Sequence, residues 1–495
     1  MPASQGVAVM NSAVPRSNSQ PESTPLVLGV NEPSLPPTEA PAAASHTEVA
    51  PVLTPALLKL RAAAQRKVLG GALIEDDLGN PIEPEIDSAS HSDRPIAPAP
   101  NGNALGRFVP VENESALAPF HERLEQLASG RDSDGKVRIL AYGASHTQGD
   151  YYTGYLRYYL QSRFGNGGPG FVQLVELNPY YKPLDIHVES SGFRVRHAQR
   201  KDAPLHDGRY GLLGAAGVAH SKTAFARISP RRPNDSASTA SRYELLYEGQ
   251  PGGGELQLLV DQRPPITLPT AQTPARGLYY TFSEPDGWHQ IEIRPSGNGS
   301  VRLYGLVVER DEPGIVIDTL GINGTRAANM LRWDARLWSE HVARRKPDLI
   351  LLAYGTNEAV DTGQPIAQYR ADLKRVIELL RANAPEAACL LVGPGDFPKE
   401  VNGNWIERPR LLELIDVQRE LAPEMGCGFW DGYEAMGGSG SMHRWVVARP
   451  RMGSPDHIHL TARGYVKMGL GLGDALMRAY DAARVVSGEL EARLR

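Results

Sequence analysis

Cysteine is scarce in this sequence, with only Cys389 and Cys427 among 495 residues. Each lies in or beside a short apolar run, "CLLV" and "CGFW". Free cysteine behaves as a small buried hydrophobe, so we expect two buried thiols on neighbouring strands rather than a disulfide or a reactive pair. Two cysteines used in this way do not identify the redox compartment.

An excess of one charge is also absent. The formal net charge is -5 and the pI is about 6.3, so neither a nucleic acid nor a membrane surface is indicated as a partner. No run approaches the ~18 consecutive apolar residues that a membrane-spanning helix needs. The first residues, "MPASQGVAVMNSAVPRSNSQPES", lack a basic segment and an apolar core, so no signal peptide is expected.

The composition that remains is that of an ordinary globular chain, with 41% hydrophobic and 22% charged residues. Residues 1–105 are the exception, because "EPSLPPTEAPAAAS" and "RPIAPAP" are typical of a disordered Pro/Ala-rich linker. One short helix interrupts this region. Thr54 and Pro55 form a cap followed by a first-turn proline, and "ALLKLRAAAQRKVL" then runs to Gly70.

From residue 106 the chain alternates between buried strands and helices. Five apolar runs read as strands: "KVRILAYG", "GIVIDTLG", "PDLILLAYG", "ACLLVGPG" and "GCGFWDG". Helical patterns follow over 153–164, 326–345, 366–383, 408–421 and from Thr461. This alternation predicts a three-layer α/β/α fold with a five-stranded parallel sheet, in which ligands lie at the carboxyl ends of the strands.

Residues 186–313 break the alternation, because strand follows strand there. In "QIEIR", Ile291 and Ile293 alternate with polar residues, as in a half-buried antiparallel strand. Turns such as "GQPGGG" and "PSGNGS" separate the strands. We predict an inserted all-β sandwich. The predicted organisation is thus a linker over 1–105, an α/β domain over 106–185 and 314–495, and the insertion between these two parts.

Three loops that follow buried strands carry residues capable of acyl-transfer chemistry. Ser145 follows the first strand in "GASHTQGD", and Asn357 follows another in "GTNE". Asp456 and His459 lie three apart in "SPDHIHLTARGY", before the last helix. A carboxylate can hold one imidazole nitrogen so that the other takes a proton, and an asparagine amide can face a developing negative charge. Taken singly, each feature is equally typical of a cap or a turn.

Taken together and in this order, the blocks "GASHT", "GINGTRA", "GTNE" and "DHIH" resemble those of the SGNH (GDSL-like) hydrolase superfamily. The resemblance implies a flavodoxin-like SGNH fold with Ser145 as nucleophile, His459 as base and Asp456 as its orienting partner. It also implies an oxyanion hole formed by the amides of Ser145 and Gly324 and the side chain of Asn357.

The first block departs from the family, which usually has Gly-Asp-Ser where this chain has Gly143-Ala144-Ser145. We hypothesise that Asp150 takes over the supporting role of the missing aspartate. His146 is expected to point away from the site. His146, His457 and His459 are interpreted as unconnected histidines rather than zinc ligands.

The segment "GASHTQGDYYTGYLRYYLQSRFGNGGPGF" and the inserted module resemble bacterial peptidoglycan O-acetylesterases, whose insertion resembles a carbohydrate-binding module. The resemblance implies a serine esterase that removes acetyl groups from a glycan, with no metal or organic cofactor. An acetylated glycan would be the partner, and an extracytoplasmic location follows from that substrate. Two alternatives remain open: an O-acyltransferase with the same triad, and an inactive glycan-binding protein. The sequence indicates no oligomeric state.

Overall fold

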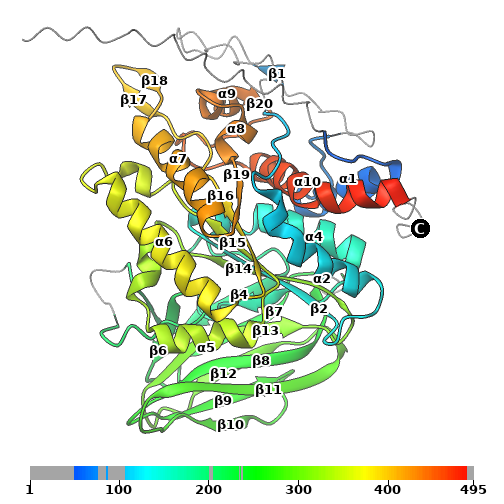
Figure 1. Cartoon of the computed structure of the whole chain (residues 1–495). Coiled ribbons are helices and arrows are strands. Elements are labelled where there is room, and N and C mark those ends of the chain that lie inside the picture. The colour runs from blue at the N-terminus through cyan, green and yellow to red at the C-terminus, as the bar shows by residue number, and fades with distance from the viewer. Residues whose placement is uncertain are drawn as a thin grey trace, which may run out of the picture. The chain divides into compact units, whose positions relative to one another are not determined.

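Five parallel strands form the central sheet, in the order β14-β2-β15-β16-β19 (Figure 1). Their bounds are β2 Lys136–Gly143, β14 Gly314–Gly321, β15 Leu349–Ala353, β16 Ala388–Val392 and β19 Gly428–Trp430. The computed structural model describes residues 50–75, 85–86, 106–199, 205–232, 235 and 238–487. The predicted α/β fold with a five-stranded parallel sheet is confirmed.

Helices cover both faces of this sheet, because successive side chains of each strand point to opposite faces. Ile139 and Ala141 of β2 belong to one hydrophobic core, and Leu140 and Tyr142 to the other. Figure 1 shows α10 and α6 on opposite sides of the sheet. The first face is covered by α2 Ala118–Ala128, α4 Tyr151–Phe164 and α10 Ala462–Ser487. The second is covered by α5 Ala335–Arg345, α6 Ile366–Asn383 and α7 Pro409–Glu424.

The helix predicted over 326–345 is two elements instead of one. A 3-10 helix, η3 (Ala327–Arg332), ends at the extended residue Trp333, and α5 begins after it. The carboxylate of Asp334 accepts a hydrogen bond from the Leu337 amide at 2.7 Å and so caps α5. Trp333 packs against Tyr142 and Trp338 in the core, which holds the chain extended at that point. The remaining short elements are η1 Glu114–Leu117, α3 Ser145–Gln148, η4 Glu358–Val360, α8 Gly432–Met436 and α9 Ser441–Val447.

The short N-terminal helix is present as α1 (Pro55–Val68), and Thr54 Oγ1 accepts from the Leu57 amide at its first turn. This helix is docked on the α/β domain. Arg61 is buried and pairs with Glu75 and with Asp474 of α10, at 2.7 and 3.1 Å. A two-stranded pair of β1 Glu85–Ile86 and β20 Ala448–Arg449 follows. The predicted disorder of 1–49, 76–84 and 87–105 lies outside the described residues.

The insertion is a pair of packed antiparallel sheets, as predicted. One has the order β10-β9-β12-β7-β4 and the other β11-β8-β13-β6-β5, with β3 also paired to β13. The first comprises β4 Ile186–Ser191, β7 Phe225–Pro230, β9 Glu255–Val260, β10 Ile266–Pro269 and β12 Ile291–Pro295. The second comprises β5 Arg194–His197, β6 Ala215–Ala219, β8 Ala240–Gly249, β11 Arg276–Gly287 and β13 Val301–Glu309. Strand β3, Gly170–Val172, precedes the insertion and extends this sheet by pairing with β13. Ile291 and Ile293 are fully buried in the core that the two sheets share, together with Leu245 and Leu306.

Beyond these sheets, a hairpin of β17 Lys399–Val401 and β18 Asn404–Ile406 follows β16. The described residues from 50 onward form one compact unit, so the predicted domain boundaries at 105, 185 and 313 stay a prediction. No helix among the described residues is long and apolar enough to span a bilayer.

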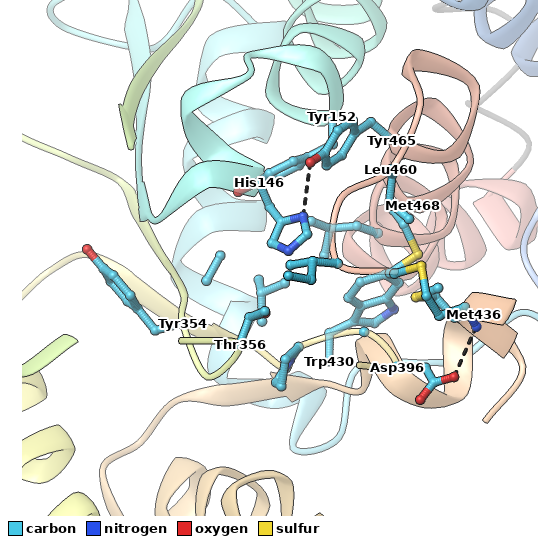
Figure 2. A pocket seen from close by; sticks show the side chains of 18 residues that line it. His146, Tyr152, Tyr354, Thr356, Asp396, Trp430, Met436, Leu460, Tyr465 and Met468 are labelled. Carbon is cyan, nitrogen blue, oxygen red and sulfur yellow. Dashed lines mark hydrogen bonds between the residues drawn. The ribbon is translucent and has the colours of Figure 1, made fainter. Parts of the chain in front are cut away.

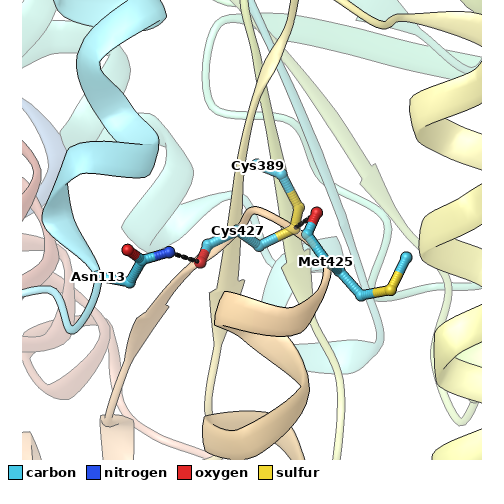
Figure 3. Close-up of a disulfide and its surroundings, with 4 residues drawn as sticks. All are labelled: Asn113, Cys389, Met425 and Cys427. Atoms are coloured by element: carbon cyan, nitrogen blue, oxygen red, sulfur yellow. Dashed lines mark hydrogen bonds between the residues drawn. A yellow bond between two sulfur atoms is a disulfide. The ribbon is translucent and has the colours of Figure 1, made fainter.

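The expectation of two free thiols is wrong, because Cys389 and Cys427 form a disulfide (Figure 3). The register of the sheet explains the pairing. Leu390 of β16 lies opposite Gly428 of β19, so the preceding residues on the two parallel strands, the cysteines, are also neighbours. Their Cα atoms are 4.6 Å apart, within the range that a disulfide requires. The bond joins β16 to the residue that precedes the edge strand β19.

Candidate active site

The nucleophile candidate lies at the carboxyl end of β2. Ser145 is the first residue of the short helix α3, directly after the strand. The turn requires glycine before it, because a Cβ at Gly143 would fall 2.0 Å from Thr147 Oγ1. The adjoining strand also ends in glycine, since a Cβ at Gly321 would lie 2.2 Å from the Gln148 amide nitrogen. The two glycines let α3 sit directly on the sheet edge.

The structure brings Ser145, His459 and Asp456 together in one hydrogen-bonded line. Ser145 Oγ is 3.0 Å from His459 Nε2, and His459 Nδ1 is 2.7 Å from Asp456 Oδ2. Burial raises the pKa of the Asp456 carboxyl. The hydrogen bonds from the His459 ring and from the His459 and Ile458 amides outweigh this effect and hold the pKa below its usual value. Asp456 is therefore an ionised acceptor at neutral pH, so His459 carries its proton on Nδ1 and Nε2 is left to accept the serine proton.

The three predicted oxyanion groups lie on neighbouring loops at the same edge. Asn357 follows β15, and its Nδ2 donates to the Thr325 carbonyl at 2.9 Å. A primary amide has two N–H groups, so this bond orients the side chain and leaves a second donor. Among the described residues, the Gly324 amide donates to no acceptor. Glu358 ties the two loops together, because its carboxylate accepts from the Ala327 and Gly355 amides at 2.9 and 3.1 Å.

Residues outside the predicted set hold these loops in place. Gln148 Oε1 accepts from the Asn323 amide at 2.9 Å, and its Nε2 donates to Asn178 Oδ1 at 3.0 Å. Gln199, which follows β5 of the inserted module, donates to the Gly324 carbonyl. The available signal for Gln148 was its position in the same block as Ser145. Gln199 carried no signal, because its contact is made across 125 residues.

Asp150 is buried under the nucleophile turn rather than pointing to solvent. Its carboxylate accepts five hydrogen bonds, from Arg157 (twice), Thr153, Thr319 and the Leu184 amide. Burial alone would raise its pKa, but Arg157 outweighs this effect and holds the pKa below its usual value. The bond to Thr319 joins this turn to β14. Asp150 thus has the contacts that the hypothesis of a substitute supporting aspartate requires.

His146 does not point away from the site, contrary to expectation. Its ring lies 5.5 Å from that of His459, and its Nδ1 is 3.1 Å from the Tyr465 hydroxyl. Burial, with a further contribution from His459, lowers the pKa of His146 to about 4, so it is neutral at neutral pH. The ring of His457 stacks on Trp405 instead of facing His146 or His459. No cluster of three or more His, Cys, Asp or Glu side chains in the described ranges is arranged to hold a metal ion.

An apolar cavity of about 80 Å³ lies beside the triad (Figure 2). Its nearer wall is formed by neighbours of the candidate catalytic residues, among them His146, Thr356, Ile458 and Leu460. The far wall in Figure 2 includes Trp430, Met436, Met468 and Asp396. Burial raises the pKa of Asp396 to about 6. Because His146 adjoins Ser145 in the sequence, and Ile458 and Leu460 flank His459, we treat the cavity as part of the same site.

The chain is similar to one protein family and to several solved structures. Residues 286–467 match the GDSL-like Lipase/Acylhydrolase family. The chain is also similar to a solved structure described as a peptidoglycan O-acetylesterase in action, with 25% identity, 75% of this chain and 99% of that chain covered, and a TM-score of 0.63. A family two carbohydrate esterase from Cellvibrio japonicus matches at 15% identity, with 60% and 98% covered and a TM-score of 0.24. No curated protein sequence matches the chain.

Proposed function

Because the chain carries a domain of the GDSL-like lipase/acylhydrolase family, we propose that it is a serine ester hydrolase that removes acetyl groups from a glycan. The observation that carries this proposal is the line from Asp456 through His459 to Ser145, with distances of 2.7 and 3.0 Å. These are the contacts that an acyl-transfer triad needs. The similarity to a peptidoglycan O-acetylesterase supports an acetylated glycan, and specifically O-acetylated peptidoglycan, as the substrate.

In this mechanism Ser145 Oγ attacks the acetyl carbonyl carbon while its proton passes to His459 Nε2. The carbonyl oxygen becomes an oxyanion, and the Ser145 amide, the Gly324 amide and the free N–H of Asn357 donate to it. The protonated His459 gives its proton to the leaving sugar oxygen, which leaves an acetyl ester on Ser145. Water then attacks this ester with His459 as base, and acetate leaves as the proton returns to Ser145. Asp456 stays ionised and orients His459 throughout.

The disulfide supports an extracytoplasmic location for this reaction. Buried disulfides form and persist mainly in oxidising compartments, and Cys389–Cys427 lies inside the α/β domain. The compartment that holds peptidoglycan is also extracytoplasmic, so substrate and disulfide point to the same place.

The test is acetate release from p-nitrophenyl acetate and from O-acetylated peptidoglycan, by the full chain and by Ser145→Ala. We expect turnover by the wild type, and a loss of nearly all of it in the variant, because the variant has no nucleophile. Near-normal activity in Ser145→Ala would reject the mechanism. Turnover of p-nitrophenyl acetate without any release from peptidoglycan would keep the esterase and reject the substrate.

A further inference from the structure

The candidate triad is open to solvent rather than enclosed. The side chains of Asp456 and His459 are 47% and 41% exposed, although they are hydrogen-bonded to each other. A deep site encloses a small ligand, whereas residues this exposed can be reached by a chain that lies along the surface. Two aromatic residues are linked to this open site, Tyr180 through the nucleophile turn and Trp405 through the loop that carries Asp456.

Tyr180 is the first of them. It is 75% exposed, which is high for a large aromatic side chain, and its ring stacks on no other ring among the described residues. Its loop is nevertheless fixed to the site. The Tyr180 amide donates to Asn178 Oδ1 at 2.9 Å, and Asn178 exchanges two hydrogen bonds with Gln148, at 3.0 and 3.1 Å. Gln148 lies three residues after Ser145, so the loop that carries the exposed ring is tied to the nucleophile turn.

Trp405 is the second, and it reaches the site from the β17–β18 hairpin. Its ring lies flat on His457, with centroids 3.6 Å apart and planes 14° apart. His457 directly follows Asp456 and is joined edge to edge to His443, with 2.9 Å between His443 Nδ1 and His457 Nε2. Because His457 Nδ1 faces the Pro455 carbonyl at 3.0 Å, it carries the ring proton, and His443 is the donor of the pair. Trp405 is therefore anchored beside the catalytic loop while its hairpin stays at the surface.

Exposed aromatic rings are suited to bind sugars, because the apolar C–H face of a pyranose packs on a ring face and a ring has few rotatable bonds to fix. We propose that Tyr180 and Trp405 form two sugar-binding positions beside the triad, one next to the nucleophile turn and the other next to the loop of Asp456 and His459. The substrate class is then a glycan chain of two or more sugar residues that crosses the site with its ester at the centre. This inference rests on the proposed esterase function and adds to it the length of the substrate and the residues that select it.

The experiment measures kcat/KM of the full chain for acetate release from O-acetylated chito-oligosaccharides of one to four sugar residues, with p-nitrophenyl acetate as reference. We expect kcat/KM of the wild type to rise about 10-fold or more from the single sugar to the longest oligomer. Tyr180→Ala should reduce that gain about 5-fold, which is the effect of losing a contact worth about 1 kcal/mol. Tyr180→Phe keeps the ring face and should keep the gain.

The test of Trp405 uses a ratio of two kcat/KM values, because replacing Trp405 also removes the ring that stacks on His457 and can change the activity on every substrate. We therefore compare Trp405→Ala with Trp405→Phe by the ratio of kcat/KM for the oligomer to that for p-nitrophenyl acetate, and expect the ratio to fall in the alanine variant and to recover in the phenylalanine variant. The matched control is Trp288→Ala, an exposed tryptophan of the inserted module that is 42% accessible. It should leave the gain with length unchanged.

Three results would overturn this inference: no gain with length in the wild type, an unchanged gain in Tyr180→Ala, or an equal loss in Trp288→Ala. Each of these results can occur while Ser145-dependent hydrolysis of p-nitrophenyl acetate persists. In that case the proposed esterase function stands, and only the proposed sugar-binding positions are rejected. If the hydrolysis of p-nitrophenyl acetate does not depend on Ser145, the proposed function itself is rejected.

Discussion

Replacing Asp150 by asparagine tests the support beneath the nucleophile turn. All five groups that contact the carboxylate are donors. Three of them face Oδ1, and the other two, Arg157 Nη2 and the Leu184 amide, face Oδ2 at 2.8 and 2.9 Å. In Asp150→Asn the side-chain amide replaces one oxygen, so its N–H groups face donors instead of providing an acceptor. At least two buried donors are then left unpaired, and Arg157 loses one of the two counter-charges that it has among the described residues, keeping Asp185.

The expected loss follows from these contacts. Each buried donor without an acceptor costs about 1–3 kcal/mol, and breaking one partner of a buried ion pair costs about 3–5 kcal/mol. We expect Asp150→Asn to lower the free energy of unfolding by about 3–5 kcal/mol, measured by urea unfolding followed by tryptophan fluorescence. The matched control is Asp311→Asn, which removes an exposed ion pair with Arg242 at 3.4 Å and should cost less than about 1 kcal/mol.

The effect of Asp150→Asn on stability should depend on pH in a defined direction. The pKa of Asp150 in the folded protein lies below its ordinary value of 3.8, so its contribution to stability is complete above that value and is lost as the pH falls through the folded pKa. The difference between wild type and Asp150→Asn should therefore narrow from about pH 5 to about pH 3. A variant as stable as Asp311→Asn, or a difference that widens on acidification, would refute the reasoning.

Three further predictions concern the oxyanion loops and the disulfide. Asn357→Ala should lower kcat for p-nitrophenyl acetate by about 10²–10³ with native stability, because it removes one donor to the oxyanion; a loss in KM alone would contradict that role. Gln199→Ala should lower kcat by up to about 5-fold, which corresponds to one neutral hydrogen bond to the Gly324 carbonyl. Gln199→Lys keeps a donor and should restore kcat. An equal loss of kcat in both variants would exclude a role of Gln199 in positioning the Gly324 loop. Replacing Cys389 and Cys427 together by alanine should lower the free energy of unfolding by about 4 kcal/mol for a loop of 38 residues, and Ellman's reagent should find no free thiol in unreduced, denatured wild type.

The α/β architecture was predictable because its signals are local. β14 and α6 have the bounds that the apolar runs and the helical periodicity predict, and Thr54 with Pro55 marks the start of α1. Trp333 shows the limit of periodicity, since the helical pattern continues through it while packing against Tyr142 and Trp338 holds the backbone extended. Such contacts join residues far apart in the chain, and no local pattern contains them.

In the candidate site, too, some residues could be predicted from the sequence and others could not. The resemblance of the four ordered blocks to a known family selected Ser145, Gly324, Asn357, Asp456 and His459 as site candidates. The structure places their loops together because strand ends in a parallel sheet meet at one edge. The sequence did not identify the residues that hold them there, which are Gln148, Asn178, Gln199 and Trp405. It also misplaced His146, whose ring lies beside His459.

By itself, the sequence determined the parallel sheet, the inserted β-sandwich and the chemical types at the strand ends, since alternation, periodicity and turn residues act over a few neighbours. Only the tertiary structure decided that Cys389 and Cys427 bond, that Asp150 is buried on Arg157, and that the inserted module reaches the Gly324 loop. These outcomes depend on strand register and on which elements pack together, and both are fixed by the burial of the whole core rather than by any single segment.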